Sequence, residues 1–95
     1  MTTTKPQVRE ATVGGLHVER SADADTAYVR LAEGKVYFTA ELSDLCHLDY
    51  TKDGLIVGIE FAGVSDGVDL EGVPRSRQVA AVLRAVGVDD LRNRG

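Results

Sequence analysis

The chain has 95 residues, of which 43% are hydrophobic and 27% are charged, and its formal net charge is −4. This is the composition of an ordinary soluble protein, and the length supports one core but not two. No apolar run approaches the roughly 20 residues that a helix needs to cross a bilayer, so we expect no membrane association.

The first ten residues are polar, contain Pro6 and lack the apolar stretch of a secretory signal. We expect a disordered lead-in over residues 1–10 and a single globular domain over residues 11–95. Cys46 is the only cysteine, so no internal disulfide can form, which is compatible with a reducing compartment. These features predict a cytoplasmic protein.

Five segments alternate apolar and polar residues, which is typical of strands with one buried face. They cover residues 15–20, 26–31, 36–42, 46–51 and 55–61. Glu33-Gly34 lies between the second and third segments, and Asp53-Gly54 lies between the fourth and fifth. Asp-Gly suits a two-residue type I′ turn, because glycine adopts positive φ without cost and aspartate tolerates it.

Each turn fixes which residues of its two strands face each other. This pairing can be tested, because facing residues in an antiparallel pair share a face of the sheet. The first turn places Val29 opposite Phe38, and the second places Leu48 opposite Ile59. Both turns therefore pair apolar residues with apolar residues, which predicts a meander of neighbouring hairpins.

The segment after the sheet repeats apolar residues at the spacing of one helical face: Val79, Val82, Leu83 and Val86. It predicts a helix from about 75 to 86, opened by Pro74 or Ser76 and closed by a left-handed Gly87. The helix needs an apolar partner, which the sheet offers on one face: Leu16, Val18, Val29, Phe38, Leu48, Val57 and Ile59. The predicted fold class is α+β, a five-stranded antiparallel meander with one C-terminal helix packed on one face.

The polar sheet face brings together three groups that can transfer protons, because the predicted register sets His47 opposite Glu60, with Asp49 adjacent. General acid–base catalysis needs such groups with shifted pKa values, normally in a cleft. A flat, solvated sheet face offers no cleft. A small enzyme that uses His47, Asp49 and Glu60 is therefore an alternative and not the leading hypothesis.

Metal and cofactor motifs are absent from the sequence. The available ligands do not match a recognised spacing: His17, Cys46, His47 and Asp49. Cys46 and His47 are adjacent in a strand and so point to opposite faces. We therefore expect no metal and no cofactor.

Three residues stand out on the polar sheet face because they have large apolar parts: Tyr28, Tyr37 and Ile56. Aromatic side chains with a polar tip suit interfaces. One helix can cover only one face of the sheet, and an open sheet also leaves two edges unpaired. We therefore expect a homodimer or another protein partner on this face.

The C-terminal region is basic, with five arginines against Asp89 and Asp90: Arg75, Arg77, Arg84, Arg92 and Arg94. Such a cluster can bind nucleic acid, with an affinity that falls steeply with salt. The acidic remainder of the chain and the dispersed arginines argue against this use. The simpler interpretation is a solvated helix face with cations near its C-terminal end.

Two segments, VERSADADTAYVRLAEG and LDYTKDGLIVGIEF, resemble a small bacterial family catalogued as domain of unknown function 2283. The first motif is matched by Ala24, Asp25, Ala27, Tyr28, Arg30 and Leu31. The second and more specific motif is matched by Asp49, Tyr50, Asp53, Gly54, Ile56, Val57, Gly58, Ile59 and Glu60. The resemblance covers about residues 16–64, and the chain departs from the pattern at Ser21, where aspartate is usual, and in its longer C-terminal helix.

The resemblance implies a fold and no established activity. Some family members appear beside small toxin-like proteins, which implies by analogy an antitoxin-like binding role. The sequence thus predicts a non-enzymatic, self-associating protein-interaction module. The alternatives are an antitoxin-like partner of a small toxin, with nucleic-acid contact through the C-terminal arginines, and the small enzyme described above.

Overall fold

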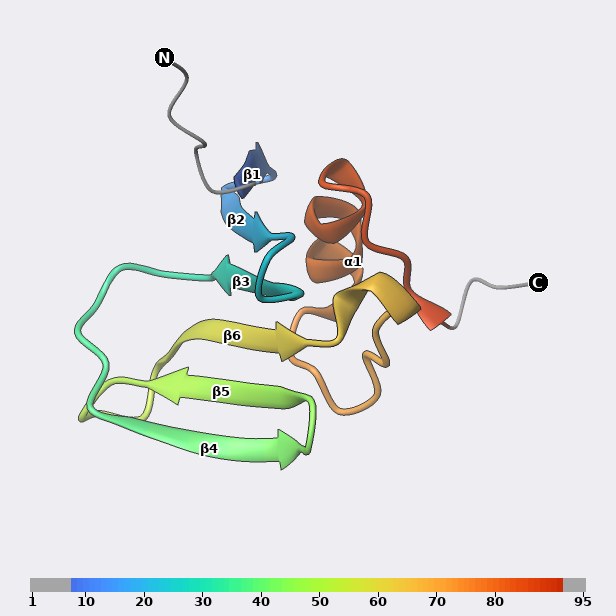
Figure 1. The fold of residues 1–95 in the computed structure, drawn as a ribbon. Helices are drawn as coiled ribbons and strands as arrows, with labels where there is room; N and C mark the ends of the chain where they lie inside the picture. Colours follow the sequence, from blue (N-terminus) through green and yellow to red (C-terminus); the bar gives the residue numbers. More distant parts are fainter. Residues whose placement is uncertain (1–7, 92–95) are drawn as a thin grey trace, which may run out of the picture.

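The computed structural model describes residues 8–91, which form one antiparallel sheet with a helix against one face (Figure 1). The strands are β1 (Val8–Val13), β2 (Leu16–Ser21), β3 (Thr26–Arg30), β4 (Phe38–Ser43), β5 (Cys46–Tyr50) and β6 (Ile56–Ala62). A short 3₁₀ helix, η1 (Val64–Asp66), and the α-helix α1 (Ser76–Ala85) follow. The α+β class is confirmed. Within this range no helix is long and apolar enough to cross a membrane.

The predicted five-stranded meander is wrong in strand number and in strand order. The sheet has six strands in the order β1-β2-β3-β6-β5-β4. The additional strand β1 begins at Val8, so residues 8–10 of the predicted lead-in are part of the sheet. Gly14 and Gly15 both have positive φ (58° and 82°) and join β1 to β2 by a tight turn. Gly14-Gly15 therefore forms a two-residue turn of the kind that the sequence predicts at Asp53-Gly54.

The strand order differs because β3 pairs with β6 and not with β4. Val29 faces Ile59 and not Phe38, and Leu31 donates its N–H to the carbonyl of Val57 (2.8 Å). Strands β4, β5 and β6 form consecutive hairpins, and β6 returns beside β3, which is a Greek-key arrangement. This order places β6, the strand with the most buried residues, in the interior of the sheet.

The inner face of the sheet is the side that packs on α1, and it contains the core. Helix α1 lies beside β1, β2 and β3 and away from β4 (Figure 1). The segment between β6 and α1 adds Val64, Val68, Leu70 and Val73 to the same core. Of the predicted sheet-face residues, all are buried except Phe38. Phe38 is 46% exposed, because it lies on the edge strand beyond the helix and stacks on Tyr50, with ring centroids 5.0 Å apart.

Helix α1 ends as the sequence predicts, at a left-handed Gly87 (φ 80°). Val88 donates its N–H to the Leu83 carbonyl and Gly87 donates to the Arg84 carbonyl, both at 3.0 Å, which is the Schellman arrangement. The Nη1 of Arg20 donates to the Val86 carbonyl at 2.9 Å. This cation therefore lies at the negative end of the helix dipole.

The turn between β5 and β6 is not of type I′. Gly54 has a φ of 86°, whereas Asp53 is outside the positive-φ region. Gly54 donates its N–H to Thr51 (3.0 Å), and Thr51 donates to Leu55 (2.9 Å), which closes a three-residue turn with a glycine bulge. A register shift between Asp49 and Tyr50 absorbs the extra residue. Beyond the shift, the predicted pairing of Leu48 with Ile59 is confirmed.

Candidate functional site

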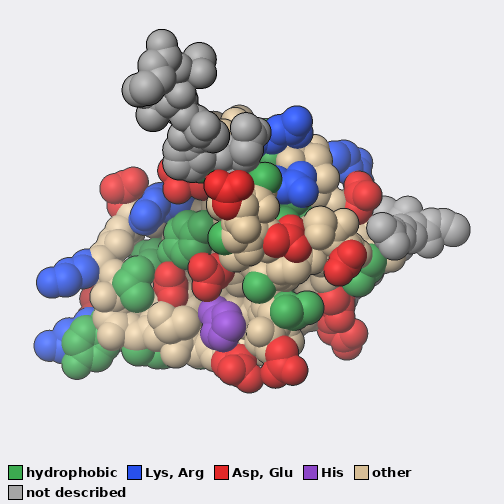
Figure 2. Space-filling view, viewed as in Figure 1, with side chains coloured by type: hydrophobic (Ala, Val, Ile, Leu, Met, Phe, Trp, Pro, Cys, Tyr) green, Lys and Arg blue, Asp and Glu red, His purple; other side chains and the backbone are tan. Residues whose placement is uncertain are grey.

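The outer face of the sheet, opposite α1, carries most of the polar residues singled out above. The strand register aligns three of them, Tyr28, His47 and Glu60, in one row across all six strands, and three glutamates complete the row: Glu10, Glu19 and Glu41. Figure 2 shows acidic side chains spread over the middle of the view, with basic side chains over α1 and at the left end, where the strand loops lie. Four carboxylates in one row make this face locally acidic.

A hydrogen-bond network crosses the outer face from β3 to β4. The Tyr28 hydroxyl donates to Asp49 Oδ2 at 2.8 Å, and the Thr39 hydroxyl donates to Asp49 Oδ1 at 2.6 Å. The Tyr28 ring lies directly over Gly58 of β6, so a Cβ at that position would collide with it. Glycine at position 58 is therefore a packing requirement, because any side chain would displace Tyr28.

The environment of Tyr28 raises the pKa of its hydroxyl to about 12. Burial is the main cause, and the hydrogen bond to Asp49 and the negative charge of that carboxylate add to it. Tyr28 therefore remains a neutral hydrogen-bond donor at physiological pH.

The residues of the enzyme alternative lie on the outer face as predicted. His47 faces Glu60, and its Nε2 lies 3.8 Å from an oxygen of Glu41. Asp49 is two residues from His47, but both its oxygens accept hydrogen bonds from Tyr28 and Thr39. Asp49 is thus held as a structural acceptor, which leaves it poorly placed to act as a base.

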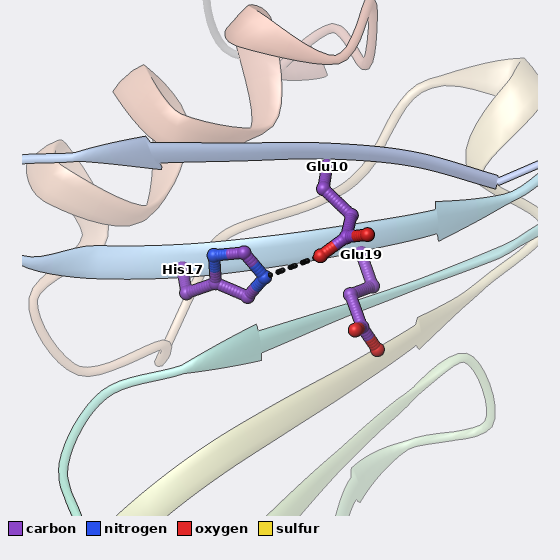
Figure 3. A group of neighbouring side chains, drawn as sticks. All are labelled: Glu10, His17 and Glu19. Carbon is purple, nitrogen blue, oxygen red and sulfur yellow. Dashed lines mark hydrogen bonds and ion pairs between the residues drawn. The ribbon is translucent and has the colours of Figure 1, made fainter.

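A second group of titratable side chains lies on β1 and β2 (Figure 3). One ligand atom from each of Glu10, His17 and Glu19 lies within 4.8 Å of the others. The Nε2 of His17 is 3.0 Å from Glu10 Oε1, and its Nδ1 is 2.9 Å from the Thr12 hydroxyl. Sequence reasoning missed Glu10, because residues 1–10 were assigned to the lead-in. The available signal is the alternation from Glu10 to Val13 before the Gly14-Gly15 pair.

The predicted interface residues have three different environments. Tyr28 is half-buried and bonded to Asp49, and Ile56 is half-buried and packs against the core. Tyr37 is 66% exposed, and its ring centroid lies 5.9 Å from the Lys52 ammonium nitrogen. Only Tyr37 of the three therefore presents most of its surface to a partner.

Exposed apolar side chains gather instead around the edge strand β4. They precede it, lie within it or follow it: Val36, Tyr37, Phe38, Leu42 and Leu45. Among residues 8–91, β4 has a strand neighbour on one side only, which is β5. β4 thus combines an unpaired sheet edge with an apolar surface.

The arginines of the nucleic-acid alternative have different surroundings. The Nη1 of Arg75 donates to the Leu31 carbonyl at 3.3 Å. Arg77 and Arg84 are exposed on α1. Arg92 and Arg94 lie outside the described residues.

Cys46 is buried, and burial raises the pKa of its thiol to about 11, with a further contribution from the charge of Asp69. It borders a cavity of about 290 Å³, whose lining also includes Leu45, Phe61, Val68 and Leu91. The thiol is therefore protonated at neutral pH and unreactive as a nucleophile.

Comparison with known proteins identifies a family but no activity. No curated protein and no solved structure matches the chain. One family model does match a segment of the chain, from β3 to β6. This segment contains the Tyr28–Asp49 hydrogen bond, Gly58 and the contact of Asp25 with Ser65 (2.9 Å). Residues 21–65, just under half of the chain, match the family described as a protein of unknown function (DUF2283), which confirms the resemblance seen in the sequence.

Proposed function

We propose that the protein is a non-enzymatic interaction module that self-associates by pairing β4 with β4 of a second copy. The observation that carries this proposal is the conjunction of an unpaired strand edge and half-exposed apolar side chains on the same strand. Strand addition uses main-chain hydrogen bonds for affinity, and neighbouring side chains add apolar contact.

The inner face of β4 supports the choice of this edge. Phe38 is 46% exposed and Leu42 is 38% exposed, whereas the inner-face residues of β2, β3 and β6 are buried under α1 and the segment that precedes it. A second copy placed across a two-fold axis would extend the sheet and cover both side chains at once.

The composition of β4 includes no lysine or proline, although the strand has a register shift between Glu41 and Ser43. Natural edge strands are commonly blocked by lysine, proline or inward-pointing charges. β4 has the sequence FTAELS, and its single charge is Glu41 on the outer face. The residues before this register shift, Phe38 to Ala40, therefore carry no charge that would oppose pairing with a copy of the strand.

Sedimentation velocity over a range of micromolar concentrations tests the proposal. We expect the wild type to sediment as a dimer and Leu42→Lys to sediment as a monomer. Val13→Lys is the matched control, because Val13 lies on the opposite edge strand and is 37% exposed, close to the value for Leu42. It should remain dimeric.

Circular dichroism of both variants verifies that they are folded. A wild type that stays monomeric throughout the concentration range would overturn self-association. A dimer that is lost in Val13→Lys and kept in Leu42→Lys would instead assign the interface to β1.

The other predicted roles use the same surfaces in different ways. In an antitoxin-like role, a strand of another protein would occupy the β4 edge. Nucleic-acid contact would depend on Arg77 and Arg84, and a duplex titration at two salt concentrations tests it. The acid–base alternative at His47 and Glu60 would need Asp49 to leave its two hydrogen-bond donors.

A further inference from the structure

We propose that Glu10, His17 and Glu19 form a binding site for a zinc ion on the outer face of β1 and β2. The three side chains share this face because His17 and Glu19 are two residues apart on β2 and Glu10 lies directly opposite Glu19. An imidazole and two carboxylates are ligands that zinc accepts, and a water molecule would complete a four-coordinate site.

The side chains already lie close to the spacing that a single ion requires. Their ligand atoms all lie within 4.8 Å of one another, and His17 Nε2 and Glu10 Oε1 are already 3.0 Å apart. Ligands about 2.1 Å from a tetrahedral ion are roughly 3.4 Å from each other. Figure 3 shows the Glu19 carboxylate beside the other two groups, and its side chain would have to rotate to bring an oxygen to that separation.

Thr12 orients the imidazole from outside the ligand set. Thr12 faces His17 across the β1–β2 pair, and its hydroxyl is 2.9 Å from Nδ1, so Nε2 is the nitrogen that faces the carboxylates. A hydroxyl can donate to Nδ1 or accept from it. With zinc on Nε2, Nδ1–H would donate to Thr12, which is the type of outer contact that fixes metal-bound histidines.

The charges around the three residues also favour a cation. Glu10 and Glu19 face each other directly, and like charges in that position destabilise a strand pair. Glu60 continues the same row on β6. Arg30 faces His17 across the β2–β3 pair, and its positive charge would disfavour a cation nearby. Its guanidinium, however, lies over the Tyr28 ring, 5.9 Å from the centroid.

Isothermal titration calorimetry of the full chain with Zn²⁺ in a chelator-free buffer tests the site. We expect one zinc ion per chain. His17→Gln and Glu19→Gln should each weaken binding at least tenfold, and Thr12→Val should weaken it roughly 10- to 100-fold by releasing the imidazole. Because these side chains are exposed or half-buried polar groups, the variants should remain folded, which circular dichroism verifies.

His47→Gln is the matched control, since His47 lies on the same face between Glu41 and Glu60. It should bind zinc as the wild type does. The imidazole ¹⁵N shifts of His17 provide a second readout, and Nε2 should be the nitrogen that responds to zinc. A titration without saturable binding, or binding that His17→Gln leaves unchanged, would overturn the site. Equal loss in His47→Gln would do the same.

Discussion

At the scale of single residues, Tyr28 links the outer face of three strands. Its ring fills the space above Gly58, and its hydroxyl reaches Asp49 on the next strand. The aromatic residue that the sequence marked as an interface candidate is therefore used inside the fold. Its neighbour Asp49, marked as a catalytic candidate, is the acceptor of the same hydrogen bond.

We expect Tyr28→Phe to lower the free energy of unfolding by roughly 1–3 kcal/mol at neutral pH, since a hydrogen bond to a carboxylate is lost. Tyr37→Phe is the control, because Tyr37 is 66% exposed, and it should change little. Urea denaturation at pH 7 measures both. Equal stability of the wild type and Tyr28→Phe would show that the hydrogen bond contributes no net energy.

The raised pKa of Tyr28 also predicts how stability changes in alkali. The hydroxyl pKa is about 12 in the folded protein and 10.0 in an ordinary environment. Between these values the unfolded chain loses its proton first, so the contribution of Tyr28 is complete below pH 10 and declines as the pH rises towards 12. Unfolding curves across this range should therefore fall more steeply for the wild type than for Tyr28→Phe. Parallel curves would contradict the assignment.

At the scale of elements, substitutions in the β5–β6 turn can distinguish the predicted type I′ turn from the observed three-residue turn. A type I′ turn needs positive φ at two residues, whereas the observed turn needs it only at Gly54. Gly54→Ala should cost about 1–2 kcal/mol, because an L-residue is strained in the left-handed region. Asp53→Ala should stay within about 0.5 kcal/mol of the wild type. Urea denaturation measures the free energy of unfolding of both variants. An equal loss at the two positions would contradict the observed turn and support a type I′ turn.

Local patterns predicted the elements that depend on neighbouring residues. The alternation around Leu48 and Ile59 identified β5, β6 and most of their register, and Gly87 marked the end of α1. The pairing of β3 with β6 could not be found in this way, because it joins segments that are about 30 residues apart. A local test of register is satisfied equally well by Val29 opposite Phe38 and by Val29 opposite Ile59.

The candidate sites depended on the same non-local contacts. Alternation placed His47, Asp49 and Glu60 on one face correctly, since strand periodicity fixes the face. It could not show that Tyr28 and Thr39 occupy both oxygens of Asp49, because those donors come from other strands. The Glu10–His17–Glu19 group was hidden by the assignment of β1 to the lead-in.

At the scale of the whole molecule, the two edges of the sheet differ in their surroundings. β1 packs against α1, and Arg9 and Arg20 lie near Gly87 at the end of that helix. β4 lies at the far side of the sheet from the helix (Figure 1). The helix therefore supports one half of the sheet, and the proposed β4 interface lies in the other half.

If folding and dimerisation through β4 are coupled, thermal stability must depend on protein concentration by mass action. A tenfold increase in concentration should raise the Tm of the wild type by roughly 3–6 °C, given the unfolding entropy of a chain of this size. Leu42→Lys should show a Tm independent of concentration, because a charge on the edge strand opposes pairing. Val13→Lys should follow the wild type. Scanning calorimetry with a chelator present excludes any effect of zinc, and a wild-type Tm that stays constant over two decades of concentration would contradict the coupling.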